Sequence, residues 1–91
     1  MTFAQSPAET LFFEGNRCMA AGDDVAAENC FRQALSLNPE FGEVFANLGL
    51  LRERSGAIAE AEECYQRAIL LCPSCVQNHL NLGALLLNGK R

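Results

Sequence analysis

Basic residues are scarce in this sequence, and long apolar runs are missing from it. Seven Lys and Arg stand against 11 Asp and Glu, which gives a formal net charge of −4 over 91 residues. Proteins that bind nucleic acids or anionic membranes usually present a basic surface, so we expect neither partner. No apolar run approaches the roughly 20 residues that cross a bilayer. The first residues also lack the basic and apolar segments of a secretory signal.

The cysteines do not predict a disulfide framework or a metal site. Five is an odd number for a closed set of disulfides, and with the missing signal it favours a reducing cytoplasm and free thiols. Cys72 and Cys75 form a CxxC motif, for which a metal or redox site is the less favoured interpretation. A structural zinc ion takes four ligands, and a thioredoxin-type motif accompanies a βαβ pattern that this sequence lacks. We therefore expect no metal and no cofactor.

The sequence repeats with a period of 34 residues. Its most complete unit runs from Gly42 to Pro73, and the stretches before and after it share its pattern of small, aromatic and proline residues. A period of this length is typical of proteins in which each repeat is a helix–turn–helix. The pairs that define the period are Gly15–Gly49, Gly49–Gly83, Gly22–Gly56, Ala27–Ala61, Ala34–Ala68 and Pro39–Pro73.

Start and stop signals divide the chain into five helices, and no strand-like alternation appears between them. Ser6, Pro7 and Glu9 form a capping-box sequence at the first start. Gly22 favours the left-handed conformation that ends a helix, and Asp23 is then suited to cap the next one. The expected helices cover about 7–21, 24–37, 40–55, 57–72 and 74–88.

The repeated pattern resembles the tetratricopeptide repeat family, in which each repeat pairs a helix A with a helix B. The resemblance covers about Ala8 to Asn88. It implies an all-α fold, a short α-solenoid of antiparallel helix pairs with five helices. The segments would be a lead-in at 1–7, repeats at 8–41 and 42–75, and helix A of an incomplete third repeat at 76–91.

The resemblance also assigns packing roles. The glycine of each helix A would let helix B approach closely where an alanine faces it. His79 stands at the family's aromatic packing position, so we expect a half-buried structural histidine there. The residues expected to face the glycines are Ala27 and Ala61, and those expected to fill the space between successive repeats are Phe31 and Tyr65.

Proteins of this family usually bind peptides along the wall formed by their A helices. Asn47 and Asn81 are equivalent positions on that wall, and an asparagine amide can both donate to and accept from a peptide backbone. They resemble the asparagine ladder of O-linked N-acetylglucosamine transferases, which Phe13 interrupts in the first repeat. The alternative is that both are ordinary polar surface residues. The expected peptide-binding residues are Phe12, Asn16, Glu43, Asn47, Leu50, Arg54, Gln77 and Asn81.

The last helix A has no helix B to cover it, and exposed apolar faces are normally interfaces. Either further repeats of a longer protein cover it, or it pairs with a second copy of the chain. No catalytic motif is recognisable. The sequence therefore predicts a non-catalytic scaffold that binds an extended peptide or a partner protein, with self-assembly as a homodimer the alternative. The expected dimer or next-repeat interface is Val76, Leu82, Leu85 and Leu86.

Overall fold

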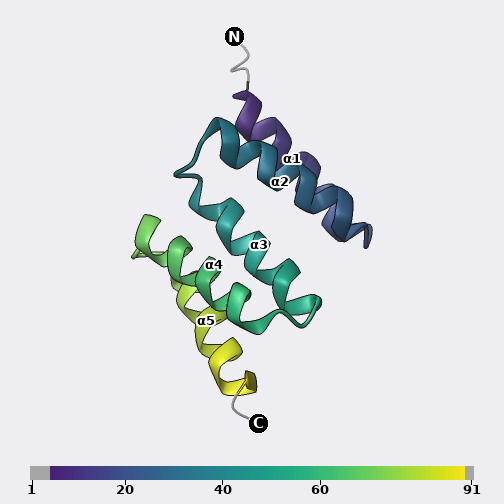
Figure 1. The fold of residues 1–91 in the computed structure, drawn as a ribbon. Helices are drawn as coiled ribbons and strands as arrows, with labels where there is room; N and C mark the ends of the chain where they lie inside the picture. The colour runs from purple at the N-terminus through teal and green to yellow at the C-terminus, as the bar shows by residue number, and fades with distance from the viewer. Residues whose placement is uncertain (1–4, 90–91) are drawn as a thin grey trace. The chain divides into compact units, whose positions relative to one another are not determined.

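A computed structural model of the chain describes residues 5–89, and these residues are helical with short turns and no strand. The all-α fold expected from the sequence is confirmed. Within each unit, consecutive helices run in opposite directions (Figure 1). The chain divides into two compact units, Met1–Phe41 and Gly42–Arg91. The helices are α1 (Pro7–Ala20), α2 (Asp24–Leu37), α3 (Gly42–Arg54), α4 (Ile58–Leu71) and α5 (Val76–Gly89).

The caps of the first unit are those that the sequence predicts. The backbone nitrogen of Glu9 donates to the Ser6 hydroxyl over 3.1 Å, and its side chain accepts from the Ser6 nitrogen over 3.1 Å. Gly22, with a φ of 83°, allows the turn after α1. Asp23 then accepts from the nitrogen of Ala26 over 3.2 Å at the start of α2. Each such cap contributes about 1 kcal/mol. By contrast, α4 follows Ala57, whose side chain makes no cap.

The first unit packs α1 against α2 around aromatic rings. Phe31 of α2 is fully buried, with Ala27 and Ala34 of the same helix buried on either side of it. Phe12 of α1 lies between Phe31 and Phe41, with ring centroids 6.3 and 5.0 Å away. Tilted ring pairs at these separations add to the free energy gained from apolar burial.

The second unit packs α4 against both α3 and α5. Tyr65 of α4 is its largest fully buried side chain, and it forms a cluster with Ala61 and with Leu85 of α5. The Tyr65 hydroxyl donates to Oε1 of Glu53 over 2.8 Å. Burial, and after it the bond to this carboxylate, raise the pKa of Tyr65 well above its usual value of about 10.

The glycines of α1 and α3 lie against aromatic rings of the following helix. A methyl group added to Gly15 would lie 2.7 Å from Cδ1 of Phe31, and one added to Gly49 would lie 2.6 Å from Cδ1 of Tyr65. Both rings pack against helix A of their own repeat, and Tyr65 also packs against Leu85 of α5, in the next repeat, as the resemblance implies. The reason is size, since only a residue without a side chain leaves room for a ring lying flat on the helix.

Cys72 and Cys75 are joined by a disulfide in the turn between α4 and α5, which corrects the expectation of free thiols. The nitrogen of Cys75 donates to the carbonyl of Cys72 over 3.2 Å, and this turn brings the two Cα atoms to 5.6 Å, within disulfide range. Asn38 and Phe41 form the same hydrogen bond before α3. These turns also explain why α3 and α5 begin at Gly42 and Val76, two residues later than predicted.

Candidate functional site

Four of the predicted binding residues share one face of α3. They are spaced by four, three and four residues, which places them on one side of a helix. Asn47 is half-buried and makes contacts of its own, whereas the residues at the two ends of the face are exposed. Leu50 packs partly into the buried cluster around Tyr65. The four residues are Glu43, Asn47, Leu50 and Arg54.

Two further predicted residues meet on α5. Nε2 of Gln77 donates to Oδ1 of Asn81 over 2.9 Å, one helical turn away. Gln77 is exposed and Asn81 is half-buried. Because an amide oxygen accepts two hydrogen bonds and an amide nitrogen donates two, Asn81 retains the capacity to pair with a peptide group. Gln77 thus orients an amide that faces partly outward.

A shared apolar cluster relates the two faces. Leu50 of α3 and Leu82 of α5 both pack against the buried cluster of Ala61, Tyr65 and Leu85. Asn47 lies one turn before Leu50, and Asn81 immediately precedes Leu82. The structure therefore holds the two asparagine-bearing helices against one cluster within the second unit.

The predicted binding residues of the first unit do not form a comparable face. Phe12 is only 9% exposed and packs against Phe31 and Phe41. Its place in the core leaves a ligand almost no surface to contact, in contrast to the expectation of a wall residue. Asn16 is half-buried and already has contacts of its own. The second unit is therefore the better-supported part of the predicted wall.

The predicted interface of α5 divides into two sides. Leu85 is 1% exposed and Leu82 is half-buried, and both pack toward α4. They belong to the core of the unit, because Tyr65 and Ala61 lie on that side of α5. Val76 and Leu86 do face solvent, together with two leucines that the prediction left out of the interface. The exposed large apolar residues of α5 are Val76, Leu80, Leu86 and Leu87.

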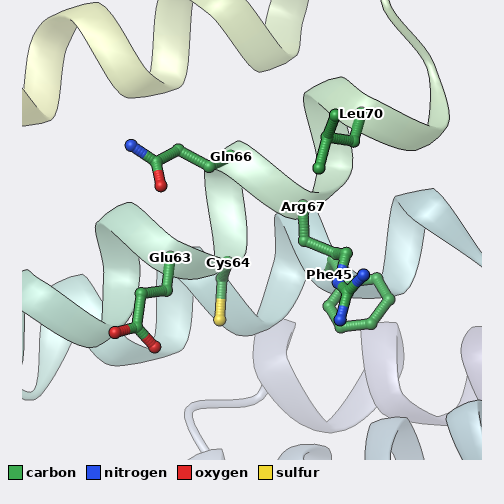
Figure 2. Close-up of a pocket in the computed structure, with 6 residues that line it drawn as sticks. All are labelled: Phe45, Glu63, Cys64, Gln66, Arg67 and Leu70. Carbon is green, nitrogen blue, oxygen red and sulfur yellow. The ribbon is translucent and has the colours of Figure 1, made fainter.

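A pocket of about 410 Å3 lies on the second unit, where α3 and α4 meet (Figure 2). Phe45 is its lining residue from α3, and the others come from α4. The guanidinium carbon of Arg67 lies 5.7 Å from the centre of the Phe45 ring, within the range of a cation–π contact. The lining residues are Phe45, Glu63, Cys64, Gln66, Arg67 and Leu70.

The pocket combines an apolar wall with one acidic residue, Glu63, and one basic residue, Arg67. Its lining residues include Cys64 but no histidine that could activate this thiol. The sequence did not indicate this pocket, because all the predicted binding residues lie on the A helices, whereas five of the six lining residues lie on α4. The available signal was Leu70, an apolar residue at an exposed position.

Comparison with known proteins decides the family. The family model for the tetratricopeptide repeat matches residues 8–41 and 42–75. The chain belongs to the tetratricopeptide repeat family. It is also similar to Tetratricopeptide repeat protein 8 of Caenorhabditis elegans, with 41% identity over 54 residues. That match covers 59% of this chain and 11% of the relative, so the chain corresponds to a small part of that protein.

Tetratricopeptide repeats generally mediate interactions between proteins, which agrees with the coarse function expected from the sequence. In the family's terms α1, α3 and α5 are A helices, and α2 and α4 are B helices. At the family's tryptophan position the chain has Leu11, Phe45 and His79. Phe45 is half-buried beside the pocket. His79 is exposed, with Nε2 2.8 Å from the carbonyl oxygen of Pro73. The resemblance implied a half-buried histidine, and this expectation is wrong, because the His79 ring lies against the turn that precedes α5.

Three of the described cysteines carry free thiols, and two of these, Cys18 and Cys30, are neighbours. Cys18, Cys30 and Cys64 are free of disulfides and half-buried. Burial, and then the neighbouring Cys18 and Glu14, raise the pKa of the Cys30 thiol, which favours its protonated form. Across residues 5–89, no three His, Cys, Asp or Glu side chains gather as metal ligands would. Within the same range, every helix is too short or too polar to cross a membrane.

Proposed function

We propose that this tetratricopeptide repeat protein is a non-catalytic scaffold whose second unit binds an extended peptide segment of a partner protein. The observation that carries the proposal is the shared cluster of Leu50, Leu82 and Tyr65, against which the helices bearing Asn47 and Asn81 both pack. The two asparagines are equivalent residues one repeat apart. Both are half-buried, so they combine a polar group with limited freedom of movement.

The asparagines bind the backbone of the peptide in this proposal. Each amide donates to a peptide carbonyl and accepts from a peptide N–H, so the contact does not depend on the peptide's side chains. Gln77 holds the Asn81 amide in place through the bond between their side chains. Leu50, which is partly exposed, adds an apolar contact between the two polar ones. Specificity then comes from the exposed charges at the ends of α3, Glu43 and Arg54.

A titration with a peptide library, followed by amide NMR, tests this proposal. We expect the largest shifts at Asn47, Leu50 and Asn81. Two lost hydrogen bonds cost about 1 to 3 kcal/mol together, so Asn81→Ala should weaken binding about tenfold or more. Asn29→Ala is the matched control, because Asn29 is an exposed asparagine on α2, outside the proposed site.

Two results would overturn the proposal. One is equal affinity of the Asn81→Ala and Asn29→Ala proteins for every peptide that binds. The other is a set of shifts confined to the pocket beside Phe45, which would assign binding to the α3–α4 pocket instead. Thermal unfolding of each variant shows whether a loss of affinity reflects a loss of fold.

A further inference from the structure

The disulfide between Cys72 and Cys75 closes a turn that the chain also forms without one. In this turn, which we call the CxxC turn, the nitrogen of Cys75 donates to the carbonyl of Cys72 over 3.2 Å. One period earlier, the nitrogen of Phe41 donates to the carbonyl of Asn38 over 3.2 Å, and neither residue contains sulfur. The disulfide is therefore a covalent link that this turn geometry does not require.

The CxxC turn is within reach of small molecules in solution. Cys72 and Cys75 are both half-buried, and the two residues between them, Pro73 and Ser74, are exposed. The disulfide thus lies at the surface of the second unit and not in the core around Tyr65. Disulfides in exposed positions are the ones that small thiols reduce most readily.

Hydrogen bonds join the CxxC turn to the first residues of α5. The carbonyl oxygen of Ala68, in the last turn of α4, accepts from the nitrogen of Cys72 over 2.9 Å. The same oxygen accepts from Nδ2 of Asn78, a buried residue of α5, over 3.3 Å. Nε2 of His79 lies 2.8 Å from the carbonyl oxygen of Pro73, inside the segment that the disulfide closes. The position of the start of α5 therefore depends on the shape of this turn.

We propose that Cys72 and Cys75 form a reversible redox site, which exchanges with low-molecular-weight thiols and sets how firmly the start of α5 is held. A thiol opens the disulfide, and a low-molecular-weight disulfide closes it again. Two thiols are fewer than the four ligands that a structural zinc ion takes, so oxidation and reduction suit this pair better than zinc binding.

Reduction takes two steps. In the first, a small thiolate attacks Sγ of Cys72, the S–S bond breaks, and the electron pair leaves on Sγ of Cys75. Cys75 directly precedes α5, and a helix N-terminus stabilises a thiolate, so its sulfur is the better leaving group. In the second, another small thiolate attacks the small-molecule sulfur of the mixed disulfide, and Sγ of Cys72 leaves. Both cysteine sulfurs take up the protons that the two thiols released, and two electrons pass to the protein as the small molecules form one disulfide.

The reduced protein holds the start of α5 less firmly than the oxidised protein. Leu85, further along α5, is buried against Tyr65 and keeps the rest of the helix on α4 in both states. The redox state thus acts on the first turns of α5 and leaves the fold of the unit intact. Gln77 and Asn81 lie in these turns, so the site also adjusts the proposed peptide-binding face, a consequence that rests on the proposed function.

Equilibration in glutathione buffers tests the exchange reaction. The full chain is incubated in a series of ratios of reduced to oxidised glutathione, and differential alkylation with mass spectrometry reports the state of each cysteine. We expect Cys72 and Cys75 to pass together from mostly oxidised to mostly reduced across the series. Cys64 is the internal control, since it is half-buried and outside any disulfide, and it should form no disulfide with either residue.

Amide hydrogen exchange measures the effect on α5. In the reduced protein, the amides of residues 76–81 should exchange about tenfold faster than in the oxidised protein, because local openings of the helix start become more frequent. The protein with Cys72→Ser and Cys75→Ser should show the faster rate in every buffer. Cys64→Ser is the matched control, because it removes a half-buried cysteine of α4 and keeps the redox pair, so its rates should follow the redox state.

Two results would overturn the proposal. One is a pair that stays oxidised in every glutathione buffer, which is the behaviour of a structural disulfide. The other is equal amide exchange at residues 76–81 in the oxidised and reduced proteins, which would leave the pair without an effect on α5. The Asn81→Ala protein should show the same redox transition, so failure of the redox site is distinguishable from failure of extended-peptide binding.

Discussion

The A helices α3 and α5 carry the same glycine but in opposite surroundings. Gly49 lies under the ring of Tyr65, whereas Gly83 has open space beside it. The comparison shows that the glycine is a packing residue, whose value depends on the helix B that covers it. Without that cover, a glycine in the middle of a helix only weakens the helix. Changes at equivalent positions should therefore have opposite effects in the two helices.

The largest expected effect is at Gly49. In Gly49→Ala the new methyl group would lie 2.5 Å from Cε1 of Tyr65, so the ring and α4 must move away. Overpacking of this kind costs about 1 to 3 kcal/mol, and we expect the upper end because the ring is fully buried. Chemical denaturation measures the loss, and a stability equal to that of the unchanged protein would contradict the packing described here.

The turn before α5 should have the next largest effect. Cys75→Ser breaks the disulfide to Cys72, and the loop-entropy relation for so short a loop gives a loss of roughly 2 kcal/mol. The equivalent turn before α3 has Asn38 and Phe41 and no disulfide. The unchanged protein should therefore be less stable to chemical denaturant with a reducing agent than without one. The stability of the Cys75→Ser protein should be the same in both conditions.

Tyr65→Phe makes the second repeat chemically like the first, where Phe31 takes the same place. The lost hydrogen bond to Glu53 should cost about 1 to 2 kcal/mol at neutral pH. Because the folded pKa of Tyr65 is raised, its stabilising effect is complete below pH 10. Above pH 10 the unfolded chain loses the proton and the folded one keeps it, so stability falls.

Denaturation at a series of alkaline pH values checks this prediction. The unchanged protein should lose stability between pH 10 and the raised pKa of Tyr65, and the Tyr65→Phe protein should lack that part of the slope. Identical slopes in the two proteins would show that other groups set the alkaline limit.

The smallest expected effect has the opposite sign. Gly83→Ala should stabilise the free chain by about 0.5 to 1 kcal/mol, because α5 gains a better helix-forming residue and nothing crowds the methyl group. Thermal unfolding provides the measurement, and Gly49→Ala is the reference for the reverse sign. Destabilisation by Gly83→Ala would mean that a helix already covers this glycine in solution.

The five helices could be predicted from the sequence, because the residues that cap helices and form turns act on neighbouring backbone groups. The 34-residue period shows that the same helix pair recurs. Ser6, Asp23 and Gly22 act through neighbouring backbone groups, and all three behave as the sequence indicates. The prediction was weaker for residues whose surroundings depend on distant parts of the chain. Phe12 was placed on the wall by its register, but Phe31 and Phe41 cover it.

Two further features, the burial of Asn78 and the disulfide, could not be predicted for the same reason. The register makes Asn78 equivalent to the apolar Val44, and it is indeed 7% exposed. Its amide nitrogen donates to the carbonyl of Ala68 over 3.3 Å, a partner that only the packing of α5 on α4 supplies. The disulfide likewise depends on the turn geometry that brings Cys72 and Cys75 together. The binding residues around Asn47 and Asn81 stay a prediction that the proposed titration tests.

The ring of Tyr65 has a consequence for how the second unit comes apart. Tyr65 of α4 contacts Gly49 of α3 and Leu85 of α5, so it belongs to the packing of α4 against both neighbouring helices. Loss of either neighbour loosens the ring for the other, so the two sets of contacts reinforce each other. The three helices should therefore melt in a single cooperative step, with the slowest amide exchange of α3 and α5 governed by one common opening.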